Sequence, residues 1–127
     1  MSKYPNVYYS MDFQGSFFNE NGVRLSPSPR DNVPVTAESF LAAVNRTGLD
    51  YILERNLEDL APWLEQYPDR IFWGTDLASP WHYDESVTDV VIRISRQFIG
   101  QLPADVQEKY AYQNAQRVLG RFLSSNP

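Results

Sequence analysis

A short, bulky apolar segment followed by a glycine and a carboxylate constrains this chain more than any other feature. Residues 71–73, Ile-Phe-Trp, have the character of a strand buried on both faces, and Gly74 and Thr75 end it before Asp76. Helical patterns lie on both sides of this segment, so we expect the strand to run parallel to another. Open α/β sheets and (β/α) barrels carry their chemistry at the carboxyl ends of parallel strands, which makes Asp76 the first functional candidate.

Length and composition restrict the class of protein. The 127 residues (14.7 kDa) allow one domain, and 43% hydrophobic with 21% charged residues is typical of a globular protein. A net charge of −5 disfavours nucleic acid and anionic membrane surfaces as partners. The absence of cysteine excludes disulfides and thiolate metal sites. No apolar run approaches the ~20 residues of a membrane span, and nothing at the start resembles a signal peptide, so we expect a soluble, cytoplasmic protein.

The first half of the chain predicts a strand, a long loop and a helical connection. Aromatic and β-branched residues after Pro5 indicate a strand of about six residues. Residues 14–35 are rich in Gly, Asn, Ser and Pro, and we favour a surface excursion over a functional lid for them. Thr36 then caps a helix that Gly48 ends. Two further helical patterns precede the second strand, and Pro62 is tolerable only in the first turn of the later one.

The clearest helical pattern comes after the second strand. Its apolar residues repeat over 87–98 at the spacing of one helical face, Asp84 or Ser86 opens it, and Gly100 ends it. In the helix that follows, Asn114 is expected to break or cap the helix before a last short amphipathic segment. The whole chain therefore predicts an α/β fold with about two parallel strands, a helical crossover and carboxyl-terminal helices.

Together these segments resemble a known family. The segment YPDRIFWGTD, the helix after it and the closing segment LPADVQEKYAYQNAQRVLG are similar to the carboxyl-terminal part of the amidohydrolase superfamily. The similarity is greatest to its metal-dependent hydrolases of the amidohydrolase-2 type, and the opening YPNVYYSMDF is similar to an earlier barrel strand of that family. The resemblance covers residues 1–13 and 60–122 and leaves 14–59 unmatched or weakly matched. It implies that the chain is part of a (β/α)8 barrel.

The resemblance implies a role for very few residues. Asp76 matches the aspartate after the family's final strand, which touches the metal or the attacking water, so Asp76 is implied as metal ligand or general base. A divalent metal, zinc as first choice, lowers the pKa of bound water, and a nearby carboxylate takes its proton. Gly74 would allow close packing at the strand end, and Asn114 with Ala115 matches a structural signature. The implied substrate is a small organic acid, lactone or amide that is hydrolysed or decarboxylated.

The histidines depart from the family pattern. The family's His-x-His and its middle-strand histidines have no counterparts, because the one histidine, His82, lies in the loop after Asp76. A hydrolytic zinc site needs about three protein ligands, for which His82, Asp76 and a third carboxylate such as Asp12 are available. A complete barrel needs ~250 residues, so this chain corresponds to about two of its strands. We expect either a fragment of a longer hydrolase or a shortened protein without a metal site.

Each candidate residue has a plainer structural alternative. Asp76 is also typical of a residue that caps a helix or ends a strand. We interpret His82 first as a solvated loop histidine. Trp81, His82 and Tyr83 are candidates for the rim of a substrate-binding site, and equally for an exposed aromatic surface that missing barrel strands would cover. Trp63 and Trp73 are assigned to the core.

Two hypotheses of different classes follow. In the first, the chain is part of a metal-dependent hydrolase or decarboxylase with a small-molecule substrate, and it is inactive in isolation because its histidine ligands lie elsewhere. In the second, it is a non-catalytic half-barrel remnant that pairs its open strand edges with itself or with a partner, because two parallel strands bury little on their own.

Overall fold

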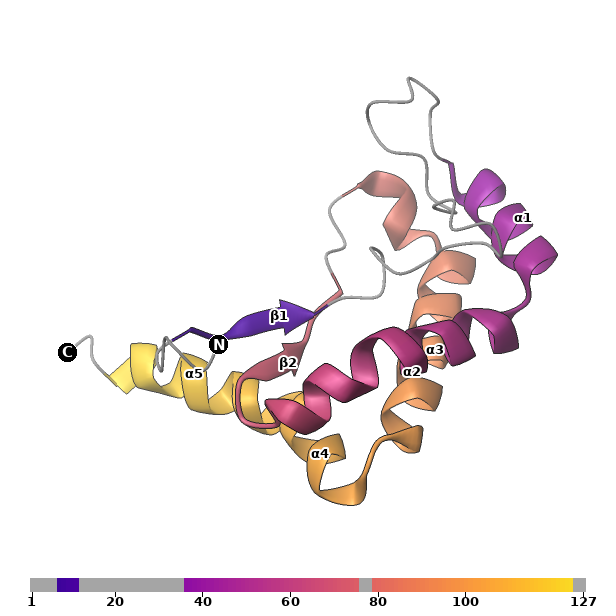
Figure 1. Cartoon of the computed structure of the whole chain (residues 1–127). Coiled ribbons are helices and arrows are strands. Elements are labelled where there is room, and N and C mark those ends of the chain that lie inside the picture. Colours follow the sequence, from indigo (N-terminus) through magenta and orange to yellow (C-terminus); the bar gives the residue numbers. More distant parts are fainter. Residues whose placement is uncertain (1–6, 12–35, 76–78, 125–127) are drawn as a thin grey trace.

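The fold is mixed α/β and mostly helical, with one two-stranded parallel sheet. The computed structural model describes residues 7–11, 36–75 and 79–124 (Figure 1). Its strands are β1 (Tyr9–Met11) and β2 (Ile71–Trp73). The helical elements are α1 (Ala37–Thr47), α2 (Leu49–Gln66), the 3₁₀ turn η3 (Pro80–Tyr83), α3 (Glu85–Gln101), α4 (Ala104–Glu108), the π-helical turn η4 (Lys109–Gln113) and α5 (Asn114–Ser124). No helix within these ranges is long and apolar enough to cross a membrane.

The two strands pair in parallel, as the sequence predicts. Tyr9 lies opposite Ile71 and Met11 opposite Trp73. The Tyr9 N–H donates to the Arg70 carbonyl at 3.0 Å, which fixes this register at one end. β1 spans three residues, against the six or so predicted: Val7 and Tyr8 are described but lie outside the strand, and the part of the prediction from Asp12 on falls outside the described ranges. The long loop predicted over 14–35 also lies outside them.

Local signals set the first helix as the sequence predicts. The Ser39 N–H donates to Thr36 Oγ1 at 3.1 Å and the Thr36 N–H donates to Ser39 Oγ at 3.0 Å, a reciprocal capping box. Gly48 has a φ of 87°, a conformation that favours glycine, and its N–H donates to the Val44 carbonyl at 2.8 Å. The chain turns here from α1 directly into α2.

The prediction for Pro62 is wrong. The two helical patterns before β2 merge into one 18-residue helix, and Pro62 lies inside it rather than in a first turn. Proline removes one helical N–H and crowds the preceding turn. Its own side chain is exposed, while Leu53 and Leu64, eleven residues apart and therefore on one face of the helix, are buried. Burial of the same helix face before and after Pro62 offsets the local cost.

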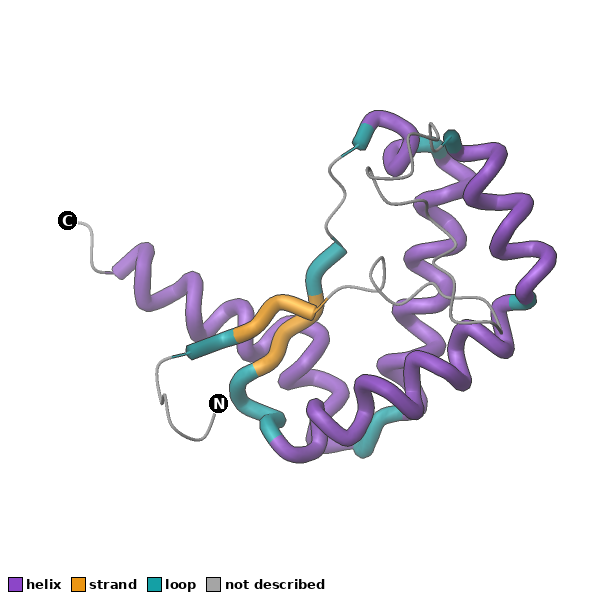
Figure 2. The backbone as a smooth tube through the Cα atoms, turned by 45° about the horizontal axis from the view of Figure 1, so that its top comes forward, coloured by secondary structure: helices purple, strands orange, loops and turns teal. Residues whose placement is uncertain are grey.

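The core lies between the sheet and the helices. Figure 2 shows the two strands between α5 on one side and the group α1, α2 and α3 on the other, as Figure 1 does. The α3 prediction is confirmed: the Asp84 carboxylate accepts from the Ser86 N–H at 3.0 Å, and the helix ends one residue beyond Gly100. The side chains buried most deeply in this core are Ile52, Leu64, Ile71, Ile94, Phe98 and Tyr110.

The two tryptophans assigned to the core differ. Trp73 is partly buried and its Nε1–H donates to the hydroxyl of buried Ser95 on α3 at 3.2 Å. Trp63 is 53% exposed and stacks on Tyr67, so its assignment to the core is wrong. Its neighbour Leu64 takes the buried position, because successive residues of a helix point about 100° apart.

Candidate functional site

The carboxyl ends of the two strands meet at one edge of the sheet. The Gly74 N–H donates to the Met11 carbonyl at 3.2 Å, so the chain leaves β2 alongside the end of β1. Asp76 and Asp12, the two carboxylates that the sequence places just after these ends, lie outside the described residues. The described part of the candidate site is therefore the strand-end scaffold and the turn η3 that follows.

Gly74 lies close to its neighbour on β1. A Cβ at residue 74 would collide with the hydroxyl of Ser10. The expected close packing at the strand end is confirmed, and Ser10 is the side chain that causes it. Any larger residue at 74 would force the two strand ends apart or displace the Ser10 side chain.

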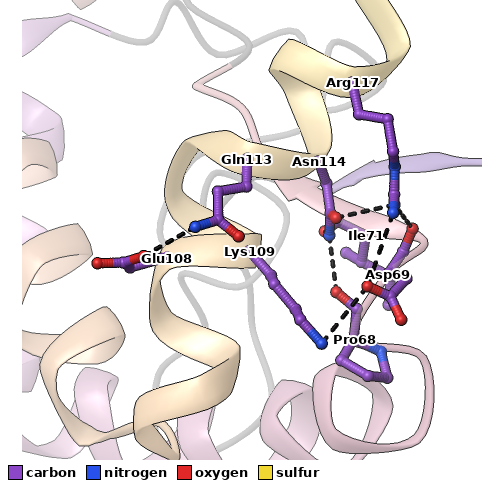
Figure 3. Close-up of polar contacts among 8 residues, drawn as sticks. All are labelled: Pro68, Asp69, Ile71, Glu108, Lys109, Gln113, Asn114 and Arg117. Atoms are coloured by element: carbon purple, nitrogen blue, oxygen red, sulfur yellow. Dashed lines mark hydrogen bonds and ion pairs between the residues drawn. The ribbon is translucent and has the colours of Figure 1, made fainter.

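One asparagine from the end of the chain holds the start of β2. Asn114 is 1% exposed, and its Nδ2 donates to the Pro68 carbonyl at 2.7 Å and to the Ile71 carbonyl at 2.8 Å (Figure 3). Its Oδ1 accepts from Arg117 Nη2 at 2.9 Å. The backbone stays helical at Asn114, so the prediction of a break there is wrong. The side chain bonds to the strand instead of capping its own helix.

A group of charges surrounds the same segment. The Asp69 carboxylate forms ion pairs with Lys109 Nζ at 3.4 Å and with Arg117 Nη1 at 3.7 Å, and Arg117 Nη2 also donates a hydrogen bond to the Asp69 carbonyl. Figure 3 shows Asn114, Lys109 and Arg117 converging on residues 68–71. The charged side chains are 31–54% exposed, so each ion pair adds only a fraction of a kcal/mol, up to about 1 kcal/mol. The buried amide bonds of Asn114 are the stronger part of this contact.

The π-helical turn η4 brings a second side chain to the sheet. Tyr110 is fully buried, its hydroxyl donates to the Met11 carbonyl at 3.2 Å, and its ring packs edge-on against Phe98 at 6.0 Å. Tyr110 therefore holds the end of β1 while Asn114 holds the start of β2. Single π-helical turns often occur at functional positions. Nothing in the local pattern at Tyr110 indicates this role, because its partner is 99 residues away.

The structure places His82 and Trp81 next to each other, with His82 buried and Trp81 partly buried. His82 is 6% exposed, so its interpretation as a solvated loop histidine is wrong. Its Nδ1 accepts from the Ser79 N–H at 3.1 Å, which leaves the proton of a neutral ring on Nε2. The Thr88 hydroxyl donates to the His82 carbonyl at 3.2 Å. Trp81 lies edge-on to His82 at 3.9 Å and 5.4 Å from the ring of Phe40, so the turn packs between α1 and α3.

The described residues do not make a metal site by themselves. They contain no group of three or more His, Cys, Asp or Glu side chains that could hold an ion. Nδ1 of His82 is already occupied by a backbone N–H. Of the three donors that the sequence offers, His82 alone is described, since Asp12 and Asp76 lie in the gaps between the described ranges.

Comparisons of this chain with models of known protein families, with curated proteins and with solved structures give no match. The resemblance to the amidohydrolase superfamily thus stays a prediction from the motifs, and the function has to be argued from the chain itself.

Proposed function

We propose that this chain is the carboxyl-terminal part of a metal-dependent hydrolase or decarboxylase of the amidohydrolase superfamily. The observation that carries the proposal is the parallel pairing of β1 with β2 across a helical connection, with both strand ends joined at Gly74. A parallel strand, a helical crossover and the next strand are the repeating unit of a (β/α)8 barrel. In such barrels the residues that follow the carboxyl ends of the strands carry the chemistry, and Asp76 is such a residue.

The two faces of the sheet support the same proposal. Side chains alternate along a strand, so Met11 and Trp73 share one face and Ser10 and Phe72 share the other. The first face packs on the helices, through Trp73 to Ser95 and through the buried Met11. On the second face Ser10 is exposed and Phe72 is partly buried. Helices that pack against one face of a parallel sheet are what two strands cut from a barrel would present.

Asp76 is the residue to which the proposal gives a chemical role, as metal ligand or general base. A divalent metal, zinc as first choice, would supply an activated water for attack on a small organic acid, lactone or amide. Because the chain has a single histidine, the proposal requires the other histidine ligands to come from chain outside these 127 residues. Trp81 and His82 then act by fixing the turn after Asp76, at the rim of the substrate site.

The intact mass of the native polypeptide tests this proposal. A barrel of ~250 residues predicts a mass about twice 14.7 kDa or more, and bound zinc in the purified native protein. A native mass of 14.7 kDa would contradict the proposal. In the longer protein, Asp76→Asn is expected to lower kcat by at least about 100-fold, while Asp89→Asn, an exposed carboxylate on α3, leaves it unchanged.

A second function, self-association, is favoured by the outer edge of β1. Because Tyr9 and Met11 bond to β2, the backbone N–H and C=O groups of Ser10 and Tyr8 point away from the sheet. No described residue covers these groups. Tyr9 is 53% exposed and Val7 47%, and a two-stranded sheet is marginal by itself. An open edge of this kind takes a further strand. Analytical ultracentrifugation of the 127-residue chain tests this, and a monomer at every concentration would exclude it.

A further inference from the structure

The open edge of β1 is complementary to a second copy of itself. We infer that two copies of this chain pair through β1 in an antiparallel register in which Tyr9 lies opposite Tyr9 of the second copy. The inference rests on the self-association proposed above and is an alternative to the hydrolase proposal, because in a longer chain a preceding strand would take the same edge.

The hydrogen bonds favour this register. The outward-facing residues are Tyr8 and Ser10, two positions apart. With Tyr9 on the two-fold axis, Tyr8 lies opposite Ser10 of the second copy, and Ser10 lies opposite its Tyr8. Each of these two pairs exchanges both N–H···O=C bonds. All outward backbone groups of the two residues are then satisfied in both copies.

The exposed apolar side chains favour the same register. Tyr9 and Met11 share one face of β1 by alternation, and Val7, two residues before Tyr9 and just outside the strand, joins that face where the pairing extends the strand. In the proposed pairing the two Tyr9 side chains lie opposite each other at the axis, and each Val7 lies opposite Met11 of the second copy. Val7 and Tyr9 are the two large apolar side chains of this segment that are exposed. Direct cross-strand pairs of this type each add about 0.2–1 kcal/mol.

Pairing of β1 with β1 of a second copy gives a closed dimer. Two-fold pairing joins the two sheets into one of four strands, in the order β2, β1, β1, β2, which passes the three strands that an independently stable sheet needs. It leaves no β1 edge open, whereas head-to-tail addition of strands would leave one at each end. The β2 edge is not equivalent, because Asn114 already occupies the Ile71 carbonyl there.

Single cysteines test the register, because the native chain has none. In the proposed register the two residues 9 form a non-hydrogen-bonded pair with Cα atoms about 4.5 Å apart, within disulfide range. Tyr9→Cys is therefore expected to give a disulfide-linked dimer under mild oxidation. Ser10→Cys is the matched control, because its two copies would lie about 8 Å apart, beyond disulfide range. Tyr9 and Ser10 are both exposed, so both variants are expected to fold.

Three outcomes separate the claims. Rapid cross-linking of Tyr9→Cys with little cross-linking of Ser10→Cys supports the register. Cross-linking of Ser10→Cys instead, in a chain that sediments as a dimer, overturns the register and leaves self-association standing. A wild-type chain that sediments as a monomer at every concentration, with neither cysteine variant cross-linked, overturns both.

Discussion

The two outer edges of the small sheet differ in whether other parts of the chain bond to them. At β2 a buried amide from the end of the chain, Asn114, occupies the Ile71 carbonyl, and the ring and hydroxyl of Tyr110 pack nearby. At β1 the backbone of Ser10 faces outward, with exposed Val7 and Tyr9 beside it. The Asn114 amide thus bonds to one outward carbonyl of β2 and to the Pro68 carbonyl just before the strand. The comparison predicts that stability is concentrated at β2 and association at β1.

The largest expected effect is at the covered edge. Asn114→Ala leaves the Pro68 and Ile71 carbonyls without their donor in a buried place, so we expect a loss of about 2–4 kcal/mol in the free energy of unfolding. Urea unfolding followed by circular dichroism measures it. Gln113→Ala is the matched control: Gln113 is exposed, bonds to Glu108, and is expected to change stability by less than about 0.5 kcal/mol. Equal effects of the two variants would show that the amide does not close this edge.

The contact between Gly74 and Ser10, where the two strands lie side by side, gives the next largest expected effect on stability. Gly74→Ala forces a Cβ into the Ser10 hydroxyl, and we expect it to destabilise the fold by about 1–3 kcal/mol. Ser10→Ala removes that hydroxyl, so the double variant is expected to recover most of the loss. A double-mutant cycle in urea measures the coupling between the two positions. Additive effects would mean that the strand ends are not in contact.

A substitution at the open edge of β1 is expected to weaken association between copies and to leave the stability of the monomer nearly unchanged. Ser10→Pro removes an outward N–H that β2 does not use, and proline is tolerated on edge strands. Two hydrogen bonds are lost per dimer, so the dimer Kd is expected to rise by about tenfold or more while the thermal midpoint of the monomer changes little. Sedimentation velocity over a concentration series measures the Kd. An unchanged Kd would place the association, if present, elsewhere on the chain.

Tyr110 contributes one hydrogen bond to the same sheet. Tyr110→Phe keeps the buried ring against Phe98 and removes the donor to the Met11 carbonyl. We expect a loss of about 1 kcal/mol, measured by thermal and urea unfolding. Tyr112→Phe, at a 45% exposed position in the same turn, is the control and is expected to be neutral. A neutral Tyr110→Phe would leave Asn114 as the sole clamp on the sheet.

Replacement of a second buried asparagine, Asn56, is expected to have the smallest effect on the free energy of unfolding, and to raise it if it changes it. Asn56 is as buried as Asn114, but among the described residues its Nδ2 bonds only to the Ile52 carbonyl of its own helix and its Oδ1 has no partner. Asn56→Leu removes the unpaired oxygen at similar volume, so we expect stability to be unchanged or raised by up to about 1 kcal/mol. A loss above 1 kcal/mol would mean that the amide has a partner of its own, such as a buried water.

The candidate site was predictable only in outline. The strand, the following Gly74 and the position of Asp76 after it are readable in the sequence, because strand composition and glycine punctuation act locally. The burial of His82 was not readable. A single histidine in a short turn between aromatic residues is part of no helical or strand repeat, so the sequence does not show whether its side chain is buried. In the structure its ring packs against Trp81 and accepts a hydrogen bond from the Ser79 N–H.

The sequence by itself determined what depends on near neighbours. The face of α3, the Thr36 cap, the Asp84 cap (one of the two residues predicted) and the end of α1 at Gly48 follow from interactions within a few residues, and all are as predicted. The tertiary structure alone decided which partners meet across long separations. Asn114 reaches carbonyls 43 and 46 residues away and Tyr110 reaches one 99 residues away, so their roles become visible only when the chain has packed. The hydrophobic repeat of a helix or strand describes that element alone. Whether the edge of a sheet is covered depends on which distant element packs against it.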